Sequence, residues 1–164
     1  MRICDYLNAD RIDLNLDRGN KAEVLRRLVV KLADSVAFDH PETLLREVMR
    51  REAVMSTGVG DGVAIPHAAA DGLAAPSIAV GVAPGGVDFA ALDGKPVHVI
   101  FLLVGSRDSP EVQLKALARI ARLTRHGELV TGLRAARSPE EALAVIERED
   151  SREDELAPPV IPSP

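Results

Sequence analysis

Aromatic side chains are scarce in this sequence of 164 residues, which has no tryptophan, one tyrosine and three phenylalanines. Proteins hold single-stranded nucleic acids by stacking bases on aromatic rings, so this composition nearly excludes such a platform. Basic charge is scarce as well, because 20 dispersed Lys and Arg residues stand against 25 Asp and Glu residues. The resulting net charge of −5 argues against binding to a nucleic-acid backbone as the main function.

The single cysteine, Cys4, excludes an internal disulfide and any cysteine-rich metal cluster. We expect it to be a small buried hydrophobic residue rather than a reactive thiol. Long apolar runs are absent too: no stretch approaches the length that crosses a bilayer, and the N-terminus has no signal-peptide pattern. The sequence therefore predicts no membrane insertion and a cytoplasmic location.

What the chain does contain is typical of a globular domain, with 46% apolar and 27% charged residues. This length suffices for one domain with a core of Leu, Val, Ile and Ala. We expect that domain to cover residues 1–148. Residues 149–164 are charged and then rich in proline, and we predict a disordered tail there.

Apolar patterning predicts an α/β arrangement. Strands are predicted at 12–16, 63–65, 78–82 and 97–104, with a short edge strand at 87–89. The run 97–104 is apolar on both faces, which indicates a central strand with a layer on each side. Helices are predicted to start near Asn20, Pro41, Ser109 and Ser138, the third ending at Gly127 and the last at about Glu147.

The most informative stretch is 56–67, where three glycines within five residues precede a short apolar run that ends in Pro66 and His67. Glycine lets the backbone turn sharply and approach a ligand, and Pro66 restricts Ile65 to extended conformations. We therefore expect a stiff, extended backbone to present His67 at the end of an element. Such a histidine can serve as a nucleophile, a base or a metal ligand, and on spacing alone a structural role is an equal alternative.

The segment 51–67 resembles the active-site region of fructose/mannitol-type enzyme IIA domains of the bacterial phosphoenolpyruvate-dependent phosphotransferase system, above all their nitrogen-regulatory branch. The similarity continues through 86–89, 92–104 and 114–123, and it covers roughly residues 1–148. The resemblance implies the enzyme IIA fold, which is a single-domain mixed β-sheet with helices on both faces.

The resemblance also implies that His67 accepts a phosphoryl group from the small phosphocarrier HPr. His67 would pass the group to a IIB domain, or retain it as a signal toward a regulated target protein. Arg51 falls where the family has an arginine near the phosphate. Transfer between two histidines requires no cofactor and no metal, and the chain length favours a stand-alone regulator over a sugar importer with fused IIB and IIC segments.

One departure from the family concerns Gln113, which stands where many members carry a second active-site histidine. An amide can donate a hydrogen bond to a phosphate but cannot be positively charged. Asp61 and Ala68 also differ from the Asn and Gly that are common in the family. Two functions therefore stay open: a phosphocarrier, or an enzyme IIA-like binding module that regulates partners without efficient phosphotransfer.

His98 lies inside an apolar strand, so we interpret it as a core histidine that could orient His67 rather than as a second acceptor. Asp61 lies between glycines and is interpreted as a turn residue rather than a general base. A metal-dependent hydrolase that uses His67, His98 and Asp61 is a third and weaker hypothesis, because no ligand pair has helical i, i+4 spacing.

Overall fold

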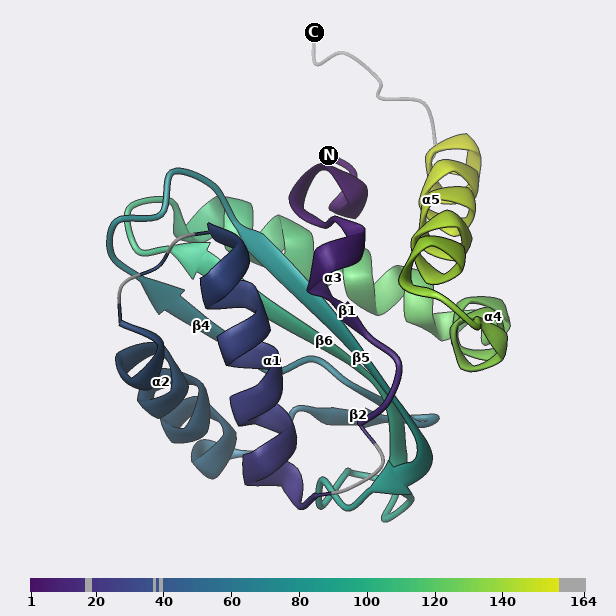
Figure 1. The fold of residues 1–164 in the computed structure, drawn as a ribbon. Coiled ribbons are helices and arrows are strands. Elements are labelled where there is room, and N and C mark those ends of the chain that lie inside the picture. Colours follow the sequence, from purple (N-terminus) through teal and green to yellow (C-terminus); the bar gives the residue numbers. More distant parts are fainter. Residues whose placement is uncertain (17–18, 37, 39, 157–164) are drawn as a thin grey trace, which may run out of the picture.

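The computed structural model describes residues 1–16, 19–36, 38 and 40–156, and it is built around a six-stranded mixed sheet (Figure 1). The strand order is β1-β5-β6-β3-β2, and β4 also pairs with β6. The strands are β1 (Ile12–Asp13), β2 (Gly58–Gly60), β3 (Val63–Ala64), β4 (His67–Ala70), β5 (Ser77–Val87) and β6 (Val97–Ser106). Strand β6 is antiparallel to β5 and parallel to both β3 and β4, so it lies at the centre of the sheet.

Helices cover both faces of the sheet, as Figure 1 shows. One face carries α1 (Lys21–Val36) and α2 (Pro41–Val54). The other carries α3 (Pro110–Arg125), α4 (Glu128–Ala135) and α5 (Pro139–Leu156), together with the short 3-10 turn η1 (Ile3–Tyr6). A second 3-10 turn, η2 (Ala9–Arg11), contacts both α1 and α5. In the described ranges, no helix has the length and apolar character that crossing a membrane requires.

Strand β6 supplies side chains to two separate cores. Ile100, Leu102 and Val104 pack into the cluster beneath α1 and α2. Val99, Phe101 and Leu103 alternate with them and pack into the cluster beneath α3, α4 and α5. All six are fully buried, which confirms the predicted central strand and the α/β fold with helices on both faces.

The four predicted helices start where the sequence predicts, but only some of the expected capping hydrogen bonds form. The side-chain oxygen of Asn20 accepts the Glu23 N–H at 3.1 Å, and Ser138 Oγ accepts the Glu141 N–H at the same distance. Ser109 occupies the N-cap of α3, but its hydroxyl makes no capping hydrogen bond. Proline at the first helical position therefore marks the start of α3 more reliably than the serine does.

Several predicted strand and helix boundaries are wrong. The alternating run 12–16 forms only the two-residue β1, because the Asn15 N–H turns back to the Asp13 carboxylate at 2.9 Å. No separate strand forms at 87–89; Val87 instead ends β5 and pairs with Val97. Helix α4 was not predicted, and neither were the short strands β2 and β4.

The last helix is longer than predicted. It runs to Leu156 rather than to about Glu147, so the predicted disorder is wrong for 149–156. The reason is that the charged residues of this segment bind arginines of α3: Asp150 and Asp154 contact Arg119, and Glu153 contacts Arg122. The rest of the predicted tail, 157–164, lies outside the described residues.

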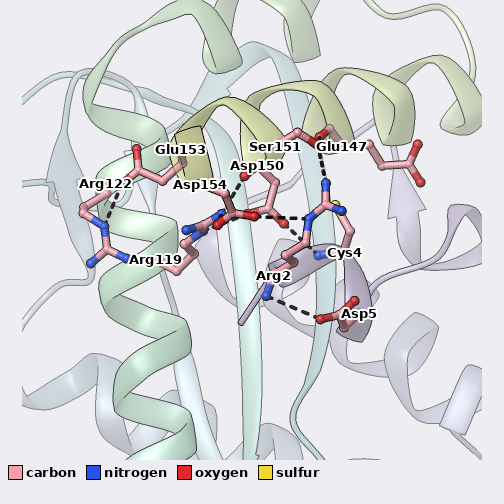
Figure 2. A network of polar contacts seen from close by, with 10 residues as sticks. All are labelled: Arg2, Cys4, Asp5, Arg119, Arg122, Glu147, Asp150, Ser151, Glu153 and Asp154. Atoms are coloured by element: carbon pink, nitrogen blue, oxygen red, sulfur yellow. Dashed lines mark hydrogen bonds and ion pairs between the residues drawn. The ribbon is translucent and has the colours of Figure 1, made fainter. Parts of the chain in front are cut away.

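An ion-pair network with the buried pair Arg119–Asp150 at its centre joins α3, α5 and η1 (Figure 2). Arg119 Nε donates to Asp150 Oδ1 at 2.8 Å, and its Nη2 donates to Asp154 Oδ1 at 2.6 Å. The backbone N–H of Cys4 donates to the other oxygen of Asp150 at 3.2 Å. Because Asp150 is fully buried, its carboxylate loses contact with water, and the ion pair with Arg119 and these hydrogen bonds compensate for that loss.

The Cys4 thiol lies half-buried beside this network. Burial, and next the Asp150 carboxylate, raise the pKa of Cys4 from 9.0 to about 12. Between pH 9 and pH 12 the Cys4 thiol stays protonated in the folded protein, whereas it is deprotonated in the unfolded chain. The contribution of Cys4 to stability is therefore complete below pH 9 and is lost as the pH rises toward 12.

We predict slow alkylation of Cys4 in the folded protein. At pH 8 its thiolate fraction is roughly a thousandfold below that of an unperturbed thiol, and the thiolate is the reacting form. Iodoacetamide should therefore modify the folded protein at least about a hundredfold more slowly than the urea-unfolded protein. Mass spectrometry over time measures both rates, and equal rates would contradict a protected thiol.

Candidate functional site

His67 is the first residue of β4 and follows Pro66 directly. In the register of the sheet it pairs with Leu103 of β6, and the Leu103 N–H donates to the Pro66 carbonyl at 3.0 Å. The backbone on both sides of the ring is therefore fixed by the central strand. The predicted presentation of His67 from an extended, stiff segment at the end of an element is confirmed.

The ring of His67 is held by one hydrogen bond that defines its tautomer. Nδ1 lies 2.9 Å from the carbonyl oxygen of Ile65. A carbonyl can only accept, so Nδ1 carries the proton and donates it. In the neutral ring the lone pair is then on Nε2, which makes Nε2 the nucleophilic atom.

A chain of hydrogen bonds from α2 positions the Ile65 carbonyl. The Ile65 N–H donates to the carbonyl of Thr57 at 3.0 Å. Thr57 in turn donates its N–H and its hydroxyl to the buried carboxylate of Glu52, at 3.0 Å and 2.5 Å. Nζ of Lys21 forms an ion pair with Oε1 of that carboxylate at 2.6 Å. Sequence reasoning did not single out Glu52 or Thr57, whose partners become evident only in the folded chain.

A cavity of about 290 Å³ opens beside His67, between α2, β4 and the first turn of α3. It is lined by Glu47, Arg50, Arg51, Val54, His67, Ala68, Ala69, Arg107 and Gln113. Three of these residues are arginines and one is a carboxylate. The structure thus brings together His67, Arg51 and Gln113 of the predicted site, and it adds Arg107.

Arg51 lies in the last turn of α2, where its Nη1 donates to the Met55 carbonyl at 3.0 Å. This bond holds the guanidinium at the end of the helix that borders the cavity. Within the described part of the chain, no carboxylate forms an ion pair with Arg51. Its remaining N–H groups are suited to bind two oxygens of one anion.

Gln113 lies in the first turn of α3, and its side chain is already engaged. Nε2 donates to the Ala68 carbonyl at 3.3 Å. The amide also packs on Gly105, where an added Cβ would lie 2.5 Å from the Gln113 oxygen. One amide N–H of Gln113 therefore fastens α3 to β4, and one remains for a ligand.

The structure does not bring His98 to this cavity. Its Nδ1 lies 3.0 Å from the Ala83 carbonyl, and its ring packs near Gly62 and Gly86. His98 precedes Leu103 by five residues on β6, which corresponds to about 17 Å along the strand. The suggestion that His98 orients His67 is therefore wrong, because the Ile65 carbonyl does so.

Asp61 is a turn residue, as interpreted from its glycine neighbours. Its φ of 54° is left-handed, and its N–H donates to the Asp93 carboxylate at 3.1 Å. The N–H of Lys95 and then that of Asp61 lower the pKa of Asp93 below its usual value. Across the ranges that the structure describes, no three His, Cys, Asp or Glu side chains could hold a metal ion together. The metal-hydrolase hypothesis therefore has no site among these residues.

Arg107, which sequence reasoning missed, follows the last residue of β6. Its backbone N–H donates to the Ala70 carbonyl at 3.1 Å and so extends the contact between β6 and β4. Its side chain donates from Nε to Asp71 at 3.0 Å and from Nη2 to the Ala69 carbonyl at 3.2 Å. The sequence did contain one indication of this role: Arg107 is a cation directly after the carboxyl end of a central strand, which is where α/β sheets bind ligands.

A family model described as the phosphoenolpyruvate-dependent sugar phosphotransferase system EIIA 2 matches residues 5–149. The chain belongs to this family. Over 146 residues it is 31% identical to a nitrogen regulatory protein of Pseudomonas aeruginosa, with coverage of 89% of this chain and 95% of that protein. The resemblance stated for 51–67, including the nitrogen-regulatory branch, is confirmed.

Two further relatives define how far the similarity extends. The enzyme IIA chain is 31% identical over 150 residues to the fructose-specific EIIABC component of Bacillus subtilis; the match covers 92% of this chain and spans only 24% of that protein. The crystal structure of the nitrogen regulatory protein IIA-Ntr from Neisseria meningitidis superimposes with a TM-score of 0.80 at 28% identity, covering 88% of this chain and 98% of that one.

Proposed function

We propose that this enzyme IIA protein is a histidine phosphocarrier of the nitrogen-regulatory type, in which Nε2 of His67 accepts a phosphoryl group from phosphorylated HPr. The observation that carries the proposal is the bond from Nδ1 of His67 to the Ile65 carbonyl at 2.9 Å. That bond leaves the Nε2 lone pair free in a side chain that borders the same cavity as the Arg51 guanidinium. Family membership supports a phosphotransferase-system donor.

In the transfer step, the lone pair on Nε2 forms a bond to the phosphorus of the donor's phosphorylated imidazolium. The donor's N–P bond breaks, and its electron pair stays on the donor nitrogen, so the donor leaves as a neutral imidazole. His67 keeps its Nδ1 proton against the Ile65 carbonyl and becomes the phosphorylated imidazolium. The reaction therefore depends on positioning and on charge stabilisation by the protein.

Arg51 and Gln113 are assigned to the phosphoryl oxygens. The Arg51 guanidinium can bind two oxygens side by side. The free amide N–H of Gln113 can donate to a third oxygen, and it does so from the first turn of α3, where the helix dipole also favours an anion.

Exposed apolar side chains flank the cavity and support docking of a protein partner. Val54 is 80% exposed and lines the cavity, and Leu114, 67% exposed, follows Gln113. Met55, 60% exposed, lies next to Val54 in sequence. We assign this rim to the contact with HPr, and with a IIB domain or a regulated target where one receives the signal.

Intact-mass spectrometry tests the proposal directly. The protein is incubated with phosphoenolpyruvate, enzyme I and HPr, and HPr phosphorylation is followed in the same sample. We expect one acid-labile phosphoryl adduct on this protein. Complete phosphorylation of HPr without any adduct on this protein would contradict the proposed function.

A second function, contact-based regulation without efficient transfer, draws support from Gln113. This residue is neutral, and one of its two amide protons is already used by the Ala68 carbonyl. A site weakened by the loss of the second histidine would then act through binding alone.

The variant Gln113→His separates the two functions. Because Arg51 and Arg107 already line the cavity, we predict that the transfer rate from HPr changes by less than about threefold. A single well-placed charged donor is worth roughly a hundredfold or more where it is missing. A gain of that size, measured by rapid-quench phosphorylation, would instead favour a degenerate site in the natural protein.

A further inference from the structure

We propose that Arg107 is a second phosphate-binding cation of this site, and that it exchanges Asp71 for the phosphoryl group when His67 is phosphorylated. The inference rests on the proposed function and deepens it, because it identifies what replaces the charge that Gln113 does not supply. Arg107 lines the same cavity as His67 and Arg51 but comes from a different element, the connection between β6 and α3.

The guanidinium of Arg107 is within reach of His67. Its Nη2 already donates to the carbonyl of Ala69, two residues along β4 from His67. Residues i and i+2 of a strand lie about 7 Å apart. A change in the side-chain torsions of a long, flexible arginine covers that distance without movement of the backbone.

The present partners of Arg107 hold it only weakly. Its ion pair with Asp71 is solvent-exposed, since the two side chains are 53% and 82% exposed. Exposed ion pairs contribute little to stability. A phosphoryl group carries a charge between −1 and −2 and offers three strong acceptor oxygens, so it competes effectively with one exposed carboxylate.

The other charged groups on the cavity are less suited to this task. Arg50 is bound to Glu47 at 2.6 Å, and this carboxylate is only 30% exposed, whereas the Asp71 partner of Arg107 is 82% exposed. The same contact balances the charge of Glu47, the one carboxylate on the cavity. Gln113 is neutral and is partly committed to Ala68. Arg107 is therefore the cation that can complement Arg51 at the phosphoryl oxygens.

The test compares Arg107→Gln with Arg50→Gln, which removes a cation from the same cavity. Transfer from phosphorylated HPr should slow by about a hundredfold in Arg107→Gln and by less than about threefold in Arg50→Gln. A ³¹P NMR titration of the phosphorylated proteins supplies a readout that a merely structural residue would not change. Loss of Arg107 should raise the pKa of the phosphoryl group by about 1, because a nearby cation stabilises the dianion.

A double variant adds a rescue experiment. Placing a histidine at the family's usual position, in Arg107→Gln/Gln113→His, should restore at least about tenfold of the lost rate. An Arg107→Gln protein with the rate and phosphoryl pKa of the natural protein would overturn the inference, even though His67 accepted the group.

Failure of the proposed function has a different signature, because the natural protein would then take no phosphoryl group. In that case, inorganic phosphate is titrated against the His67 ring signals in ¹H NMR. Binding at least about tenfold weaker in Arg107→Gln would support the role of Arg107. Equal binding in the two proteins, or no binding in either, would overturn it.

Discussion

Replacing His67 by glutamine is expected to abolish phosphorylation by HPr, whereas the same replacement at His98 should leave the transfer rate within about threefold of the natural value. Glutamine keeps a side-chain N–H that can donate to the Ile65 carbonyl, but an amide has no nucleophilic lone pair on nitrogen. His98 bonds to Ala83 and takes no part in the cavity. Quantitative mass spectrometry of both variants measures the effect.

Folding controls make this comparison decisive. The unfolding free energy of His67→Gln should stay within about 1 kcal/mol of the natural protein, because the ring is only partly buried and lies outside both cores. A phosphoryl adduct that persists in a folded His67→Gln protein would show that another side chain is the acceptor. Loss of the adduct in His98→Gln would show that the strand position of His98 matters for the site after all.

Replacing Arg119 by alanine is expected to lower the unfolding free energy by about 3 to 5 kcal/mol. The substitution leaves the carboxylate of Asp150 fully buried without its cation, which is the costly way to break an ion pair. It also removes the link from α3 to Asp154 (Figure 2). Urea denaturation followed by circular dichroism measures the loss.

Arg122→Ala is the matched control for Arg119→Ala. Arg122 lies one turn further along α3 and pairs with Glu153 of the same partner helix, but its side chain is 48% exposed. Its removal should cost less than about 1 kcal/mol. Similar losses for the two variants would mean that burial of the Arg119 pair does not determine its contribution.

Sequence patterning was sufficient where a residue's role depends on its neighbours in the chain. The run 97–104 is apolar at every position but His98, which is typical of a strand buried on both faces, and it forms β6. Pro66 and the register with Leu103 fix His67 as the motif suggested. Proline at the first helical position located α2 and α3.

Roles that depend on distant partners could not be predicted in this way. The charged segment 149–156 looks like a solvated tail until Arg119, 31 residues from Asp150, is placed against it. Arg107 carries no motif, and its position beside His67 follows from the pairing of β4 with β6. Which ring nitrogen of His67 carries the proton follows from the position of the Ile65 carbonyl. The sequence does not define that position.

The most direct test is a ¹H–¹⁵N NMR experiment on protein labelled with ¹⁵N-histidine, recorded before and after phosphorylation by HPr. Before phosphorylation, Nδ1 of His67 should carry the proton and Nε2 should be unprotonated. After phosphorylation, the nitrogen coupled to phosphorus should be Nε2, with Nδ1 still protonated against Ile65. A phosphoryl group on Nδ1 of His67, or on any other residue, would contradict the assignment of His67 Nε2 as the acceptor.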